Sequence, residues 1–224
     1  MRSEPSAQSI TVADQRVSAL LELPPAARAL LVLGHGAGAG MRHPFMAATA
    51  DRLAVEGIAT LRYQFPYMES GLSRTDTPAV AMATVRAACA EAARLAGDLP
   101  VIAGGKSFGG RMTSSAQAES PLADVGGLVF LGFPLHPPKR PGTSRAEHLD
   151  RVTVPMLFLQ GTRDDLADLE LIRTVIGRLG PRATLHVVDG ADHSFAVLKR
   201  SGRTADEVLA ELAGAVAGWI ERVL

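Results

Sequence analysis

The stretch that decides the fold is Val101-Ile102-Ala103-Gly104-Gly105-Lys106-Ser107-Phe108-Gly109-Gly110. Its three apolar residues are typical of a buried strand, and the segment from Gly110 onward is predicted to be a helix. Between them, residues 105–109 have the pattern G-x-S-x-G, which gains meaning from this strand–turn–helix context. Glycines on both sides of the serine leave the room that a sharp turn needs. We therefore expect Ser107 to stand exposed at one edge of a sheet.

Short apolar runs recur along the rest of the chain and predict the other strands. Continuous runs of this kind are typical of strands that are buried on both faces of a mainly parallel sheet. The segments between them have helical spacing, which indicates helices on both faces of that sheet. An alternating pattern over residues 8–23 predicts an additional N-terminal hairpin. The runs are Ala29–Leu33, Ile58–Leu61, Val101–Ala103, Val125–Leu131, Val154–Leu159 and the weaker Ala183–Val188.

The composition favours one soluble domain over residues 1–224. Hydrophobic residues make up 47% of the chain and charged residues 21%, which is ordinary for a globular domain. The 23 basic and 23 acidic residues balance, so we expect neither nucleic acid nor a membrane as a partner. The single cysteine, Cys89, and the polar N-terminus favour a cytoplasmic location. We expect Cys89 to be packed in a helix rather than catalytic.

An acid and a base follow two later strands. Asp164 and Asp165 come after the run that ends at Leu159, and His193 follows the run that ends at Val188. The carboxyl ends of parallel strands share one sheet edge, so these side chains are predicted to lie near Ser107. His193 would take the serine proton, and an aspartate would orient the imidazole. Asp164 and Asp165 compete for the acid role, and we favour Asp164.

Two backbone N–H groups are candidates to stabilise a negative oxygen in an oxyanion hole. One belongs to Phe108, which follows the serine, and the other to Ala37 in the glycine-rich loop at residues 34–40. That loop also fits a dinucleotide fingerprint, but the next strand ends in Arg62-Tyr63 with no acidic residue for a ribose. The dinucleotide interpretation therefore ranks below that of a serine nucleophile with an oxyanion hole.

The same residues predict an open site without a metal or organic cofactor. Only Phe133–Glu147 separates the strand ending at Leu131 from the approach to the next, so a cap over the site is expected to be minimal or missing. No spacing among the histidines and carboxylates suits a metal. The candidate substrate-binding residues are His35, Lys106, Phe133 and Phe195.

Four segments together resemble the α/β-hydrolase superfamily, and within it the dienelactone-hydrolase-like members. They are HGAGAGMRHPFM (35–46), GGKSFGGRM (104–112), QGTRDD (160–165) and DGADHSF (189–195). The resemblance implies an α/β-hydrolase fold from about Leu30 to the C-terminal helix. It also implies a triad and an oxyanion hole at the residues already singled out. Dienelactone hydrolases carry a cysteine nucleophile, whereas this chain has Ser107 at that position.

We therefore expect a serine hydrolase that forms an acyl-enzyme on Ser107 and acts on a small carboxylic ester or thioester. Transfer to an acceptor other than water, including peroxide, is an open variant of the same chemistry. The alternative is a non-catalytic scaffold that binds a protein partner, because the HGAG…HPFM segment also resembles chromatin-complex subunits in eukaryotes.

Overall fold

The computed structural model describes residues 4–224 and contains one eight-stranded sheet with the order β1-β2-β4-β3-β5-β6-β7-β8. Strands β3 to β8 run parallel, and β1 and β2 form an antiparallel hairpin that joins the sheet through β4. The strands are β1 Ser6–Val12, β2 Gln15–Glu22, β3 Ala29–Gly34, β4 Ile58–Tyr63, β5 Val101–Lys106, β6 Val125–Leu131, β7 Met156–Gly161 and β8 Ala183–Val188.

Each strand expected from an apolar run is present, and the hairpin expected over residues 8–23 is also confirmed. Every residue of β3, β4, β5 and β7 is buried, as the continuous apolar runs of the inner strands predict. β8 lies at the edge of the sheet and is only partly buried, which explains its weaker apolar pattern.

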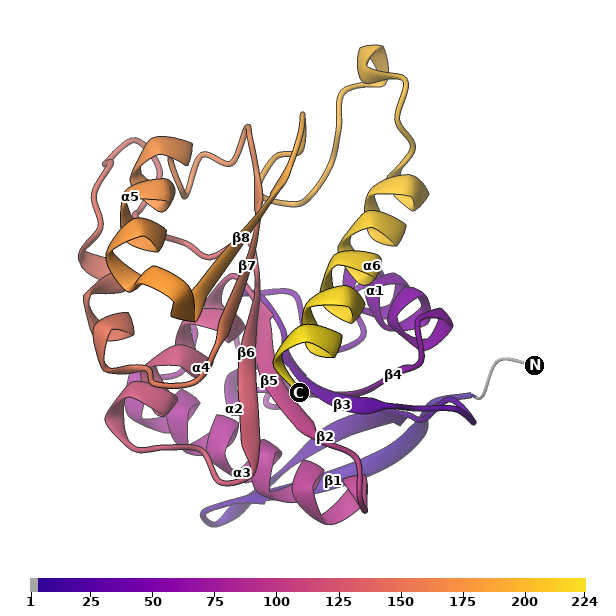
Figure 1. The fold of residues 1–224 in the computed structure, drawn as a ribbon. Coiled ribbons are helices and arrows are strands. Elements are labelled where there is room, and N and C mark those ends of the chain that lie inside the picture. The colour runs from indigo at the N-terminus through magenta and orange to yellow at the C-terminus, as the bar shows by residue number, and fades with distance from the viewer. Residues whose placement is uncertain (1–3) are drawn as a thin grey trace.

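Helices cover both faces of the sheet (Figure 1). α1 and α6 lie together on one face, and α3, α4 and α5 lie on the other. The helices are α1 Pro44–Val55, α2 Pro66–Glu69, α3 Pro78–Ala96, α4 Phe108–Glu119, α5 Leu169–Leu179 and α6 Ala205–Val223. Short 3₁₀ segments are η1 Ser144–Arg151, η2 Gly180–Arg182 and η3 Lys199–Ser201.

Local sequence explains where several helices begin. Thr77 accepts a hydrogen bond from the Val80 N–H at the start of α3, and Thr204 and Glu207 form a capping box at the start of α6. The helix expected from Gly110 begins two residues earlier, at Phe108. The turn before it is complete by Ser107, so the backbone enters the helix at once.

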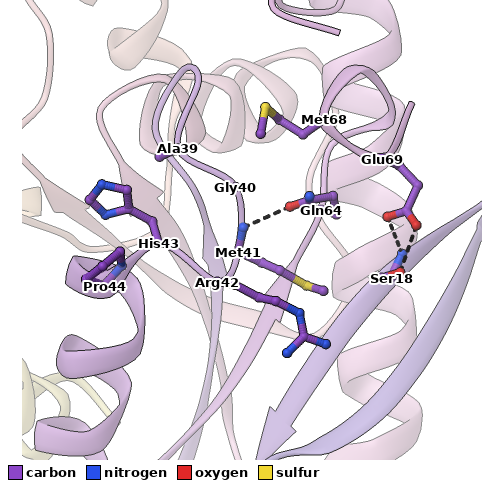
Figure 2. Close-up of a pocket in the computed structure, with 10 residues that line it drawn as sticks. All are labelled: Ser18, Ala39, Gly40, Met41, Arg42, His43, Pro44, Gln64, Met68 and Glu69. Atoms are coloured by element: carbon purple, nitrogen blue, oxygen red, sulfur yellow. Dashed lines mark hydrogen bonds between the residues drawn. The ribbon is translucent and has the colours of Figure 1, made fainter. Parts of the chain in front are cut away.

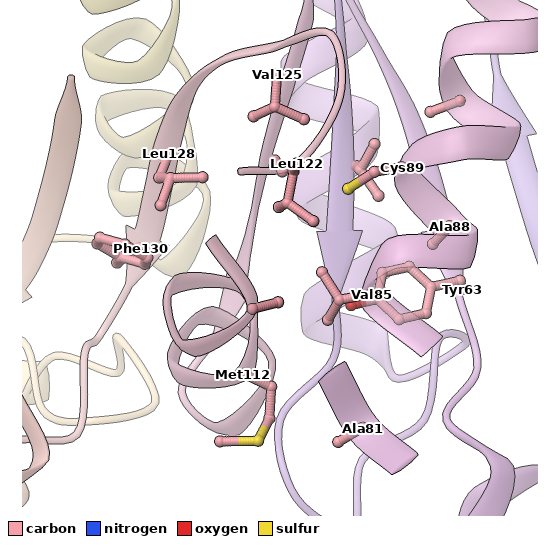
Figure 3. Packing of buried hydrophobic residues seen from close by; sticks show 14 of the residues in the cluster. Tyr63, Ala81, Val85, Ala88, Cys89, Met112, Leu122, Val125, Leu128 and Phe130 are labelled. Atoms are coloured by element: carbon pink, nitrogen blue, oxygen red, sulfur yellow. The ribbon is translucent and has the colours of Figure 1, made fainter. Parts of the chain in front are cut away.

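A hydrophobic core lies on each face of the sheet. The larger one joins the sheet to α3, α4 and α5, and the smaller one joins it to α1 and α6. Figure 3 shows Cys89 of α3 in the larger core, among apolar side chains that include Val85 and Leu122. Burial raises the pKa of the Cys89 thiol to about 12, so the thiolate needed for nucleophilic chemistry does not form at neutral pH.

The connection between β6 and β7 contains no α-helix, only the 3₁₀ segment η1. A large cap over the carboxyl ends of the strands is therefore missing, as expected from the short sequence between these strands. None of the helices within residues 4–224 is both long enough and apolar enough to cross a membrane.

Candidate active site

Ser107 stands in a strained turn between β5 and α4. Its backbone has φ +49° and ψ −109°, a combination that few residues other than glycine adopt. Strain of this kind persists where the surrounding structure enforces it, and it clusters at functional sites. The turn ends β5 and starts α4 without a connecting loop, which is the geometry of a nucleophile elbow.

The glycines around Ser107 allow three backbone segments to approach closely. A Cβ atom on Gly105 would lie 2.4 Å from the Gly34 carbonyl oxygen, and one on Gly109 would lie 2.4 Å from the same atom. Real Cβ atoms do not come this close to backbone oxygen. The ends of β3 and β5 and the start of α4 can therefore meet only because both positions lack a side chain.

His193 lies within hydrogen-bond distance of Ser107. Its Nε2 is 2.9 Å from the Ser107 Oγ, and its Nδ1 is 2.7 and 2.9 Å from the two carboxylate oxygens of Asp164. A carboxylate only accepts hydrogen bonds, so the Nδ1–H donates to Asp164. This leaves Nε2 free to accept from the Ser107 hydroxyl. The three side chains form a continuous chain of hydrogen bonds.

The loop that carries His193 is held by its neighbour Asp192. The Asp192 carboxylate accepts hydrogen bonds from the N–H groups of Ser194 and Ala196, at 2.8 and 3.0 Å. These bonds close a tight turn in which Phe195 has φ +62°. The turn directs the Phe195 ring inward, where it is 4% exposed. His193 therefore projects from a fixed backbone.

Asp164 is buried, and both of its carboxylate oxygens accept hydrogen bonds. Its carboxylate accepts a hydrogen bond from the Leu166 N–H at 2.8 Å and another from the side chain of Gln160, in addition to the bond from His193. Asp165, the competing candidate, is exposed. Of the two aspartates, Asp164 is thus the one that contacts His193.

Lys106 links the strand that carries the serine to the loop that carries the histidine. Its ammonium donates to the His193 carbonyl oxygen at 2.6 Å and lies 5.5 Å from the centre of the Phe195 ring. Burial lowers the pKa of Lys106 to about 8, and the nearby Asp164 and Asp192 partly offset that effect. Gly132 makes room for this arrangement, since a Cβ there would lie 3.0 Å from the Lys106 Nζ.

The candidate oxyanion hole lies beside the serine. Ala37 lines the same pocket as Ser107, and across residues 4–224 its N–H has no acceptor. Phe108 is the first residue of α4, and N–H groups in the first turn of a helix have no intrahelical partner. A Cβ on Gly36, the residue before Ala37, would lie 3.5 Å from the Lys106 Cγ and 3.9 Å from the Ser107 Cβ, so the loop runs in van der Waals contact with the end of β5.

Ser107 opens into a pocket of about 370 Å³, which has mainly apolar walls. Of the four predicted substrate-binding residues, Lys106 lines this pocket and Phe195 lines an adjoining groove. His35 and Phe133 are both 0% exposed, so neither can contact a ligand while the chain is folded in this way. The direct-contact role predicted for these two residues is therefore wrong.

The structure gives His35 and Phe133 different roles. The His35 Nε2 accepts a hydrogen bond from the Phe65 N–H at 3.2 Å, and its Nδ1 donates to the Gly36 carbonyl oxygen at 2.8 Å. His35 thereby holds the loop that carries Ala37. Phe133 packs against Phe130 and Phe158 in the larger core. The position of a residue at the end of a strand does not show whether its side chain lines the pocket or packs in the core.

Sequence reasoning missed Gln160 and Asp192. Gln160 is 0% exposed and holds Asp164 through its side-chain amide, while its oxygen accepts from the Phe133 N–H at 3.0 Å. A polar residue at the end of an apolar strand was the available signal for Gln160. For Asp192, the available signal was an aspartate directly before the candidate base His193.

A second serine–histidine pair lies between α4 and η1. The Ser114 Oγ is 2.7 Å from the His148 Nε2. Ser114 is 0% exposed, and its hydroxyl is also 3.0 Å from the Arg111 carbonyl oxygen. Within residues 4–224 no carboxylate bonds to His148, and burial together with the nearby cations Arg111 and Arg151 lowers the pKa of His148 to about 4. This pair joins two packed elements and has no access for a substrate.

A polar depression of about 440 Å³ adjoins the pocket at Ser107 (Figure 2). It shares Ala39 and His43 with that pocket. In its wall, the Gln64 side chain accepts from the Met41 N–H at 2.8 Å. This bond braces the loop that carries Ala37. Residues 4–224 contain no group of three or more histidine, cysteine or acidic side chains arranged to hold a metal ion.

The fold corresponds to that of known proteins over nearly the whole chain. A dienelactone hydrolase from Anabaena variabilis aligns with TM-score 0.76 and 21% identity, over 99% of this chain and all of that one. A serine hydrolase without a lid from Xanthomonas campestris aligns with TM-score 0.75 and 19% identity, over 100% and 97%. Est1E from Butyrivibrio proteoclasticus gives 0.73 and 17%, over 98% of both chains. The shared architecture is the α/β-hydrolase fold.

The sequence itself identifies the family. Residues 27–221 match the profile of a family described as "Alpha/beta hydrolase domain". This chain belongs to that family.

Proposed function

We propose that this protein is a serine hydrolase that cleaves small carboxylic esters or thioesters through an acyl-enzyme on Ser107. The observation that carries the proposal is the unbroken hydrogen-bond chain from Ser107 through His193 to Asp164, opening into an apolar pocket. A serine hydroxyl becomes an effective nucleophile when a base accepts its proton. A structural serine has no need of a strained backbone and an aligned base.

In the proposed reaction, the Ser107 Oγ attacks the ester carbonyl carbon while His193 Nε2 takes the hydroxyl proton. The carbonyl oxygen becomes negative and accepts hydrogen bonds from the N–H groups of Ala37 and Phe108. The C–O or C–S bond to the leaving group then breaks, and His193 returns its proton to that group. Water repeats the sequence and releases the acid.

Asp164 stabilises the imidazolium that forms on His193 during each half of the cycle. The Lys106 ammonium donates a hydrogen bond to the backbone carbonyl of His193 and therefore holds the base in place. The missing cap leaves the acyl-enzyme open to water, which favours hydrolysis over transfer to another acceptor. A scaffold role is less well supported, because binding a protein partner does not require this relay.

The test is covalent labelling by a fluorophosphonate, followed by peptide mass analysis and by assays with p-nitrophenyl acetate. We expect one adduct on Ser107, because the probe reacts with activated serines. Ser107→Ala should lose the adduct and at least about a thousandfold of kcat while it keeps its circular dichroism spectrum. Ser114→Ala is the matched control and should retain labelling. A folded wild-type protein without adduct or esterase activity would contradict the proposal.

A further inference from the structure

An apolar groove of about 280 Å³ lies next to the catalytic pocket, between α1, α6 and the loop that carries His193. Of its nine lining residues, only Ser194 has a polar side chain. The lining residues are Pro44, Phe45, Ala48, Ser194, Phe195, Ala196, Ala205, Val208 and Leu209.

The groove continues directly from the catalytic pocket. Phe45 and Ser194 line both spaces. The rings of Phe45 and Phe195 stack with their centres 5.8 Å apart and 7° between their planes, so both contribute apolar surface to the groove. A ligand arm that starts at Ser107 can therefore pass Ser194 and stay in contact with carbon.

Fixed elements form the groove. α1 and α6 pack together in the smaller core, and an ion pair between Arg52 and Asp206 also joins them. Asp192 closes the turn beneath Ser194, and Lys106 binds the backbone at His193. The groove is thus part of the folded scaffold. Its volume equals that of about nine water molecules, which suits an alkyl chain of several carbons.

The position of His193 decides which arm of an ester faces the groove. In the second half of acylation, Nε2 must reach the leaving oxygen, so the alcohol part lies on the His193 side of the reacting carbon. The groove begins at Ser194, the next residue in the chain. The polar depression at Ala39 and His43 lies on the oxyanion-loop side of the pocket.

We propose that this groove binds the alcohol part of the substrate, and that the preferred alcohol is an unbranched or aromatic apolar group. This inference rests on the proposed function, because it assigns a substrate arm to the same site. Burial of apolar surface supplies the binding energy and raises kcat/KM for longer alcohols. Charged alcohols find no partner in the groove and should be poor substrates.

The experiment compares two ester series at fixed pH by titrating the acid released. Alkyl acetates from methyl to hexyl vary only the alcohol, and p-nitrophenyl esters from acetate to hexanoate vary only the acyl group. We expect kcat/KM to rise about two- to fourfold per methylene along the alkyl acetates, until the groove is filled. A flat alkyl acetate series would overturn the inference.

Two alanines of α6 provide matched variants. Ala205 lines the groove and Ala210 does not, although both are exposed. Ala205→Trp should lower the hexyl-to-methyl acetate ratio of kcat/KM at least tenfold, while Ala210→Trp keeps the wild-type ratio. Ala48→Phe fills the groove from α1 and should act like Ala205→Trp, so the test does not depend on one variant folding.

The acyl series distinguishes a groove that binds the alcohol part from one that binds the acyl part or no substrate. If Ala205→Trp lowers the hexanoate-to-acetate ratio instead, the groove binds the acyl arm and the assignment is wrong. If neither ratio changes, the groove does not bind substrate. These outcomes leave the proposed function standing, because wild-type hydrolysis and labelling of Ser107 persist. Absence of both would overturn the proposed function and this inference together.

Discussion

Three side chains that follow three separate strands form the candidate relay. Each is held by neighbouring residues that take no part in the proposed proton transfers. A strained backbone fixes Ser107. The turn closed by Asp192 and the hydrogen bond from Lys106 fix His193. The side chain of Gln160 fixes Asp164. The supporting contacts are to backbone atoms or buried amides. They orient the relay without adding a competing base.

The two neighbouring aspartates provide a prediction at this scale. Asp164→Asn should reduce kcat by about 10³- to 10⁴-fold, because an amide no longer stabilises the imidazolium or fixes the correct tautomer. Asp165→Asn changes the same charge one residue away on an exposed side chain and should retain activity within about twofold. Steady-state kinetics with p-nitrophenyl acetate check both. Equal losses in the two variants would contradict the assignment of Asp164.

At the scale of elements, the site depends on how closely β3, β5 and α4 approach one another. Gly109 lies in the first turn of α4, where alanine normally favours a helix by about 1 kcal/mol. Here the added Cβ would meet the Gly34 carbonyl oxygen at 2.4 Å. The steric conflict involves backbone on both sides, so it outweighs the helix preference.

Gly109→Ala should therefore lower the melting temperature and the activity together, with a loss of stability on the order of 1–3 kcal/mol. Gly177→Ala in α5 is the matched control, since a Cβ there meets nothing within 4 Å and the helix preference acts alone. That control should melt at the wild-type temperature or above it. Thermal unfolding followed by circular dichroism measures both. An unchanged melting temperature for Gly109→Ala would be inconsistent with the close contact.

The sequence allowed the elements to be predicted better than the pocket. Apolar runs identified the strands because a strand buried on both faces needs nearly continuous carbon, as in β3 and β7. The order of Ser107, Asp164 and His193 along these strands predicted their meeting. Whether a side chain at a strand end points to the pocket or the core depends on backbone twist and neighbouring packing. Local sequence does not encode these, so Phe133 was assigned to the wrong environment.

At the scale of the whole molecule, two histidines, the buried His35 and the partly buried His148, couple stability to pH. Burial lowers the pKa of His35 to about 4, and His148 is lowered to about 4 as well. Between pH 6.5 and 4 the unfolded chain binds more protons at these positions than the folded chain does. The free energy of unfolding therefore falls as the pH drops through this window and is fully regained above about 6.5.

His35→Gln should weaken this dependence, because glutamine can accept from the Phe65 N–H and does not titrate. The shift at His35 corresponds to a change in unfolding free energy on the order of 3 kcal/mol across the window. His43→Asn replaces an exposed histidine at the start of α1 with another good cap, and should keep the wild-type slope. Urea unfolding at pH 7 and pH 5 measures both variants. Parallel wild-type and His35→Gln curves would contradict the role of His35.

The short connection between β6 and β7 also affects how the protein meets its substrate. Because no large cap has to lift away, Ser107 needs no oil–water boundary to become accessible. Its rate should rise smoothly with dissolved ester and show no jump when the ester begins to form droplets. For the same reason, no cap limits the size of the molecule that carries the ester. An ester group that projects from a polymer or a particle surface can reach Ser107 as directly as one in free solution.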